Sequence, residues 1–206
     1  MRNEREIYMF CNPEDFEFEL AKRTIVNLNN IDRQYVQQKA AGKKDTEITD
    51  VYEVTQLLNS FIGLLVIPRE KFLKYGNLWM PPRFVTKEAQ DLLRELNAEK
   101  NKPSKRFYTT YKNKNGNLEQ LNPWTISRHL RNAISHDSLD IQPQTVKEGD
   151  SITGFVFKDK DPKTNDRFML ALTIKEIRLL LIEMANLILS QFPERFEPLS
   201  LEYLEL

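Results

Sequence analysis

The chain contains only two histidines, His129 and His136, and both lie in one short segment beside Arg128 and Arg131. Imidazole has an unperturbed pKa of ~6.5 and therefore exchanges protons near neutral pH. Guanidinium keeps its charge and can bind phosphate oxygens bidentately. The combination suits cleavage of a phosphodiester bond. The alternative is that both histidines merely lie on the surface of an amphipathic helix.

The same segment is predicted to be helical. Asn122 can cap a helix N terminus, and Pro123 suits the first position because it lacks an amide hydrogen. The apolar stripe of this helix is Ile126, Leu130, Ala133 and Ile134. Arg131 and His136 would diverge by about 140° on an ideal helix. Both could therefore reach one substrate only if the helix ends near His136, or if a second copy of the helix completes the site.

Other helices are predicted from apolar spacings of three and four residues. The first runs from near Pro13 to Gly42, and the second from about Thr46 to Leu65. The third covers about Thr86 to Ala98 and would bury Ala89, Leu92, Leu93 and Leu96. The last helix should open with a capping box of Thr173 and Glu176.

The remaining segments are shorter and more polar. Residues 99–122 are expected to form a basic loop or insertion. Leu139 to Gln142 and Ser151 to Phe157 suit two strands of a hairpin, with Gly149 and Asp150 between them. The predicted fold class is mainly α, a helical bundle with a small β-hairpin insertion before the last helix. Residues 1–206 are expected to form a single domain.

Composition limits the classes of function. The 206 residues include 30 basic and 30 acidic side chains, so any affinity for nucleic acid must come from a local patch. Cys11 is the only cysteine, and no Cys/His cluster has zinc-site spacing, which predicts no metal and no cofactor. The N terminus lacks the apolar region of a signal peptide, and Leu179 to Leu189 is too short to span a bilayer. We therefore expect a cytoplasmic protein without a membrane partner.

The motif itself resembles that of the HEPN superfamily (higher eukaryotes and prokaryotes nucleotide-binding). That family has an Arg, four to six intervening residues and a His, commonly with a polar residue after the Arg. The matching segment here is Arg131-Asn132-Ala133-Ile134-Ser135-His136. Together with residues 55–68 and 152–157, it is similar to a plasmid- and phage-defence branch of the family. The resemblance covers residues 13–70 and 120–192 and implies a bundle of HEPN type.

The resemblance implies a metal-independent endoribonuclease that uses the 2′-hydroxyl of RNA as nucleophile and leaves a 2′,3′-cyclic phosphate. His136 would transfer protons, Arg131 would stabilise charge on the phosphate, and Asn132 would orient His136. The family habit of pairing two motifs implies a homodimer with a composite active site. A toxin or antiviral-defence role, with an antitoxin or defence-system partner, would follow. The rival hypothesis is a non-catalytic HEPN-like adaptor that binds RNA or protein.

A second group of residues suits contact with RNA. Residues 100–114 combine several basic side chains with aromatic ones, and such segments can bind phosphates and stack on bases. With Arg128, the candidate RNA-binding residues are Lys105, Arg106, Tyr108, Tyr111, Lys112 and Lys114. A solvated basic loop is the equal alternative. His129 lies outside the family motif and is expected to be a helix-surface residue.

Overall fold

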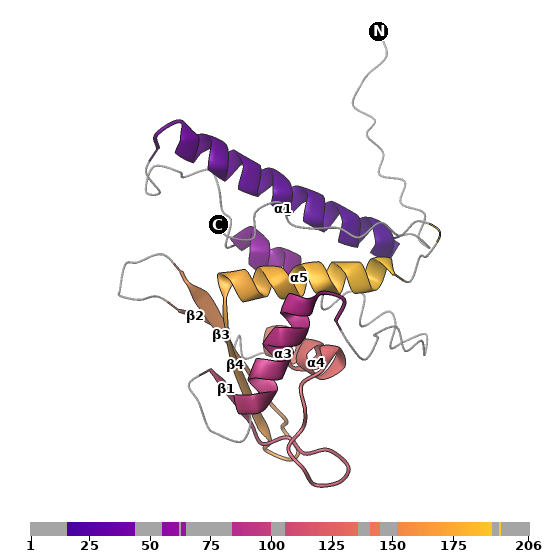
Figure 1. The fold of residues 1–206 in the computed structure, drawn as a ribbon. Coiled ribbons are helices and arrows are strands. Elements are labelled where there is room, and N and C mark those ends of the chain that lie inside the picture. Colours follow the sequence, from indigo (N-terminus) through magenta and orange to yellow (C-terminus); the bar gives the residue numbers. More distant parts are fainter. Residues whose placement is uncertain are drawn as a thin grey trace.

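The structure is a computed structural model that describes residues 16–43, 55–61, 63–64, 84–99, 106–135, 141–144, 152–190 and 194. The labelled helices are α1 (Phe16–Ala40), α3 (Lys87–Glu99), α4 (Pro123–Ser135) and α5 (Ile174–Leu189). The strands are β1 (Phe107–Thr109), β2 (Ile141–Gln144), β3 (Gly154–Lys160) and β4 (Arg167–Thr173). Residues 55–61 and 63–64 are also helical. The fold is thus mainly α-helical with one antiparallel sheet (Figure 1).

Helix α5 is the centre of the fold. It lies between α1 on one side and α3, α4 and the sheet on the other (Figure 1). Nearly every residue from Ile177 to Leu189 is buried. A helix that is buried on all sides must be surrounded by other elements. The remaining elements are therefore arranged around α5.

Two charged residues of α5 are buried with it and connect it to other helices. Arg178 forms an ion pair with Asp32 of α1, and both side chains are fully buried. The Glu183 carboxylate accepts hydrogen bonds from the backbone N–H groups of Val85 (2.6 Å) and Thr86 (3.0 Å). These amides immediately precede α3. Neither contact was predicted from the sequence, because the apolar spacing of this helix indicates only one buried face.

The helix ends follow the predicted capping chemistry. Gly42 has φ +83°, and the N–H groups of Gly42 and Lys43 donate to Lys39 and Gln38. This is the Schellman arrangement, in which glycine accepts the left-handed conformation without strain. The capping box of Thr173 with its third helical residue is present, as predicted. The four predicted buried residues of α3 are also confirmed.

The sheet has the strand order β1-β4-β3-β2, and all neighbouring strands are antiparallel. The residues of β3 and β4 that face the core are buried and recur at every second position, as expected for a sheet with one face on the core, and on β4 Ala171 is buried in addition. On β3 the buried alternating set is Phe155, Phe157 and Asp159. Helix α4 packs on β3, and α5 packs against β3 and β4. An aspartate thus occupies the helix-facing side of the sheet.

The predicted two-stranded hairpin is incomplete as a description of this region. Strands β2 and β3 do pair, but a further strand, β4, follows β3 in the sequence and pairs with it before the last helix begins. Strand β4 was missed because residues 167–173 form a nearly continuous apolar run that does not alternate. At the start of β3, a Cβ on Gly154 would lie 2.3 Å from the Leu172 carbonyl oxygen. Only glycine permits this close approach of the two backbones.

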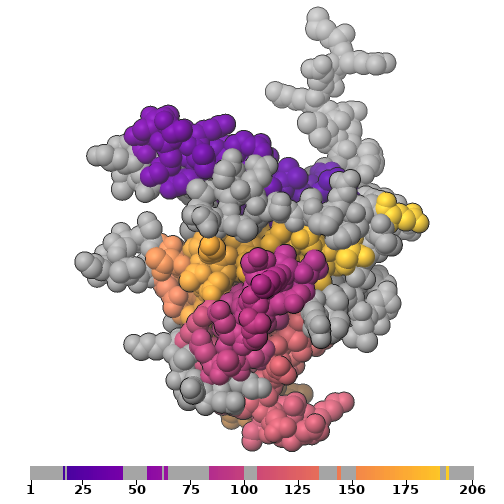
Figure 2. Space-filling model, in the orientation of Figure 1, coloured from indigo at the N-terminus to yellow at the C-terminus, as the bar shows by residue number. Residues whose placement is uncertain are grey.

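The segment expected to be a basic loop contains ordered structure between residues 106 and 122. It supplies β1 and a tight turn closed by a bridge between Lys112 and Leu118. Asn113 holds this turn, because its side-chain oxygen accepts from the N–H groups of Asn115 and Asn117. Figure 2 shows the segment projecting from the body at the end opposite α1. At the base of the turn, Glu119 N–H donates to the Tyr111 carbonyl over 2.8 Å.

Candidate functional site

Helix α4 carries the first part of the Arg-x4-His motif. Asn122 caps the helix as predicted, and its side-chain oxygen accepts from the Thr125 N–H over 2.9 Å. Arg131 and Asn132 lie near the other end, both half-buried, and the helix ends at Ser135. His136 lies outside the described residues. The angle of about 140° between Arg131 and His136 assumes an ideal helix that includes both residues. The relative placement of these two residues therefore stays a prediction.

Asn132 contacts an acidic residue that the sequence analysis did not single out. Its Nδ2 donates to Oδ2 of Asp159 over 3.1 Å. Asp159 is on β3, on the face that packs against α4, and only 6% of its surface is exposed. The expected partner of Asn132 was His136. The partner that the structure shows is Asp159.

His129 is buried, with 1% of its surface exposed, so the prediction of a helix-surface position is wrong. Its ring stacks on Phe168 at 4.1 Å with an interplanar angle of 8°. Its Nδ1 lies 2.7 Å from Asp159 Oδ2. Asp159 and Phe168 face each other directly in the β3–β4 register. The ring therefore lies over this cross-strand pair. The sequence pattern predicted that this side of α4 is exposed, but the sheet packs against it.

The other edge of the His129 ring meets a second carboxylate. Nε2 of His129 lies 2.9 Å from Glu119 Oε2, and Nη2 of Arg128 donates to the same oxygen over 2.5 Å. Tyr111 completes the cluster, since its ring meets the imidazole edge-on at 4.5 Å. The Arg128 guanidinium lies 5.7 Å from the centre of the Tyr111 ring. The base of the projecting turn is thus attached to α4.

Both ring nitrogens of His129 lie within hydrogen-bond distance of carboxylate oxygens. A carboxylate only accepts hydrogen bonds, so Nδ1 carries a hydrogen that it donates to Asp159. Nε2 lies 2.9 Å from Glu119 Oε2 and also 2.9 Å from Arg128 Nη2. It donates to the carboxylate when it carries a hydrogen and accepts from the guanidinium when it does not.

The network changes the proton affinity of its acidic members. Burial alone would raise the pKa of Glu119, but the hydrogen bond from His129 and the positive charges of Arg128 and His129 outweigh it and lower that pKa. The pKa of Asp159 is also lowered, because hydrogen bonds from His129 and Asn132 outweigh burial. Burial and the neighbouring Asp159 raise the pKa of Tyr111. Both carboxylates are consequently ionised at neutral pH and Tyr111 is protonated.

Two sequence signals could have shown that Asp159 and His129 are buried. The alternation Phe155, Phe157 continues to Asp159, which places the aspartate on the buried face of a strand. His129 is three residues after Ile126 and four before Ala133, so helical spacing places it beside the apolar stripe. Neither signal says that the two residues meet. Their contact depends on α4 packing across β3.

The structure places the candidate RNA-binding residues in two different environments. Tyr108, Lys112 and Lys114 are exposed, whereas Lys105 lies outside the described residues. Arg106 forms an ion pair with Glu176, and Tyr111 and Arg128 belong to the His129 cluster. The exposed members all lie on β1 or in the projecting turn. Among the candidates that the structure describes, these three are therefore the accessible ones for contact with RNA.

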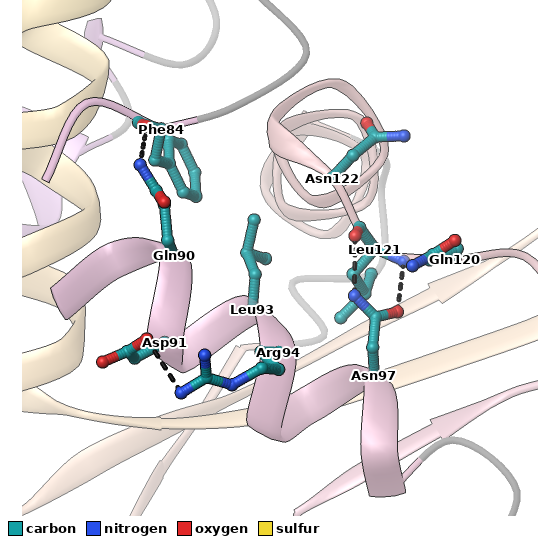
Figure 3. Close-up of a pocket in the computed structure, with 9 residues that line it drawn as sticks. All are labelled: Phe84, Gln90, Asp91, Leu93, Arg94, Asn97, Gln120, Leu121 and Asn122. Carbon is teal, nitrogen blue, oxygen red and sulfur yellow. Dashed lines mark hydrogen bonds and ion pairs between the residues drawn. The ribbon is translucent and has the colours of Figure 1, made fainter. Parts of the chain in front are cut away.

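A cleft of about 700 Å³ lies at the N-terminal end of α4, the end away from Arg131 and Asn132 (Figure 3). It lies between α3 and the residues that cap α4, and several of its polar groups bond to one another. The Asn97 amide donates to and accepts from the backbone of Leu121, with both distances 2.8 Å. Gln90 donates to the Phe84 carbonyl, and Arg94 pairs with Asp91. We interpret these contacts as a structural junction between α3 and α4.

Within the described part of the chain, no three His, Cys, Asp or Glu side chains are placed to hold a metal ion. No helix in those same ranges has the length and apolar character needed to cross a membrane.

The chain was compared with known proteins. A family model described as HEPN pEK499 p136 matches residues 1–195. The match extends over residues 75–120, for which the sequence resemblance had no counterpart. The searches of curated proteins and of solved structures found no match.

The lowered pKa of Asp159 predicts a specific dependence of stability on pH. Replacing Asp159 with Asn should lower the free energy of unfolding at neutral pH by about 1–3 kcal/mol, because the buried negative charge is lost and one acceptor oxygen is replaced by a donor NH₂ group. An ionised carboxylate with a depressed pKa stabilises the fold above its unfolded-state pKa of 3.8. Its contribution disappears as pH falls below that value through the folded-state pKa.

Urea unfolding of the wild type and Asp159→Asn, at neutral pH and at several values below 3.8, measures this effect. The difference between the two proteins should shrink as the pH falls. The Glu119→Gln variant provides a parallel series with an unfolded-state pKa of 4.5. A difference that stays constant down to the lowest pH at which both proteins fold would contradict an ionised, stabilising Asp159.

Proposed function

Because the chain belongs to the HEPN pEK499 p136 family, we propose that it is a metal-independent endoribonuclease. One observation carries the proposal: a family member has Arg131, Asn132 and His136 in the Arg-x4-His spacing, with the first two near the end of α4. We further propose that cleavage of cellular RNA makes the protein a toxin or antiviral-defence effector. An antitoxin or activating partner would control such an activity.

The proposed reaction uses a group supplied by the substrate. The 2′-oxygen of RNA attacks the adjacent phosphorus, the bond to the 5′-oxygen breaks, and a 2′,3′-cyclic phosphate remains. His136 transfers the proton at the 2′-oxygen or at the leaving 5′-oxygen. Arg131 stabilises the negative charge that accumulates on the phosphate oxygens. Asn132 is the polar member that orients the reacting groups.

The environment of α4 supports this proposal. A reacting group must be held in place, and side chains on a well-packed helix are held more firmly than those on a loop. Helix α4 is fixed by its apolar stripe and also by the hydrogen bonds of His129 and Asn132 to the sheet. Arg131 and Asn132 therefore lie near the end of a helix that hydrogen bonds to a buried aspartate hold on the sheet.

The central prediction is that Arg131→Ala and His136→Ala each abolish RNA cleavage. Loss of general acid-base catalysis alone should lower the rate by about 100- to 10,000-fold. The assay incubates purified protein with mixed RNA in excess EDTA and identifies the cleaved ends. Cyclic-phosphate ends are expected from the wild type.

Arg94→Ala is the matched control for the arginine variant, because Arg94 lies on α3 with 77% of its side chain exposed. It should retain wild-type activity. Circular dichroism checks that each variant is folded. Full activity of His136→Ala would overturn the assignment of the site, and RNA binding by the wild type without cleavage would favour the adaptor hypothesis.

A second prediction concerns the projecting turn. Replacing Lys112 and Lys114 with Gln should weaken RNA binding and flatten its salt dependence, because fewer counterions are released. For single-stranded RNA the slope should fall by about 0.7 for each phosphate that the protein no longer neutralises. The control variant, Lys87→Gln with Arg94→Gln, removes two exposed charges from α3 instead. Equal salt slopes for both variants would mean that the turn is merely solvated.

We also propose that the active form is a homodimer with a composite active site, on the basis of the family resemblance. Mixing inactive Arg131→Ala protein with inactive His136→Ala protein tests this arrangement under conditions of subunit exchange. If the two groups come from different chains, the heterodimer contains one intact pair and should regain partial activity. A mixture that stays inactive would contradict a shared site, as would a fully active monomer in sedimentation experiments.

A further inference from the structure

We infer that Asp159 is a positioning residue for the motif helix, and that it fixes the Asn132 amide with its oxygen turned away from the sheet. The inference rests on the proposed function, in which Asn132 belongs to the reacting site. Asp159 is 27 residues after Asn132 and outside the Arg-x4-His motif. Its role follows from three contacts to a single oxygen atom.

Oδ2 of Asp159 is the point at which three elements meet. It accepts from Nδ1 of His129 at 2.7 Å, from Nδ2 of Asn132 at 3.1 Å, and from the Tyr111 hydroxyl at 3.3 Å. Two of these donors lie on α4, and the third lies at the base of the projecting turn. One carboxylate on β3 therefore holds both the motif helix and the turn that carries the exposed lysines.

Asp159 is itself held firmly. It lies opposite Phe168 in the β3–β4 register, and the His129 ring stacks on Phe168. Only 4% of its side chain is exposed, so water cannot replace a missing partner. A buried ionised carboxylate is retained only while its hydrogen-bond donors remain in place. These constraints leave Asp159 little freedom to follow a movement of Asn132.

The chemistry of the contact decides the orientation of the amide. An ionised carboxylate only accepts hydrogen bonds, so the amide must turn its NH₂ group towards Asp159. Its carbonyl oxygen Oδ1 then points the other way. In the proposed reaction, Asn132 therefore offers an acceptor rather than a donor, suited to the hydrogen of the 2′-hydroxyl. A reversed amide would offer a donor and would break the hydrogen bond to Asp159.

A double-mutant cycle tests whether Asp159 acts through Asn132. The cleavage rate and the KM for RNA are measured for the wild type, Asp159→Asn, Asn132→Ala and the double variant. Asp159→Asn should lower kcat on the order of 10- to 100-fold, the size of effect expected from a misplaced group, with little change in KM. In the Asn132→Ala background the same change should have almost no further effect on kcat.

Glu119→Gln is the matched control, because it removes the other carboxylate bound to His129 while its described contacts do not reach Asn132. Its kcat should stay near that of the wild type, whatever it does to stability. Asp159→Glu is the second variant if Asp159→Asn does not fold. It keeps the charge opposite His129 but moves the oxygen by one methylene, and it should also lower kcat. Additive effects in the cycle, or an equal loss in Glu119→Gln, would overturn the inference.

A measurement without RNA separates this inference from the proposed function. In the wild type, the side-chain NH₂ of Asn132 should be protected from hydrogen exchange in NMR spectra, and in Asp159→Asn or Asp159→Glu it should lose this protection. A protein that cuts no RNA but shows this pattern would refute the nuclease proposal and leave the positioning contact intact. Unchanged protection in both Asp159 variants would refute the positioning contact, whatever the nuclease activity.

Discussion

A charged side chain in an apolar interior is tolerated only when it is paired or hydrogen-bonded, and α5 buries two of them. Arg178 requires Asp32 on α1, and Glu183 requires the backbone amides that precede α3. Breaking one member of such a contact leaves an uncompensated charge, which costs about 3–5 kcal/mol for a buried ion pair. The positions of α1 and of the start of α3 are therefore set by α5.

The same helix constrains the candidate site through the sheet. Strand β4 leads directly into α5, and Glu176 in its first turn pairs with Arg106 beside β1. The sheet then presents Asp159 to α4, where the polar cluster around His129 forms. The bundle and the motif helix are thus connected through the sheet.

Local rules were sufficient for much of the fold. The caps at Asn122 and Thr173 and the four buried residues of α3 follow from spacing and side-chain chemistry. Long-range packing was not predictable in this way. His129 looked exposed because an isolated helix cannot show that a sheet covers its flank, and β4 lacked alternation. The pairing of Asn132 with Asp159 joins two elements whose packing no local pattern encodes.

The junction between β4 and α5 has a mechanical consequence. Thr173 is both the last residue of the strand and the N-cap of the helix, so no linker residue separates the two elements. A hinge requires residues that can absorb a change in backbone dihedral angles. This junction has no such linker residue, and both the side chain and the backbone of Thr173 take part in the capping box. The sheet and the central helix are consequently expected to move together as one rigid unit, so any relative movement of the elements has to occur at other connections.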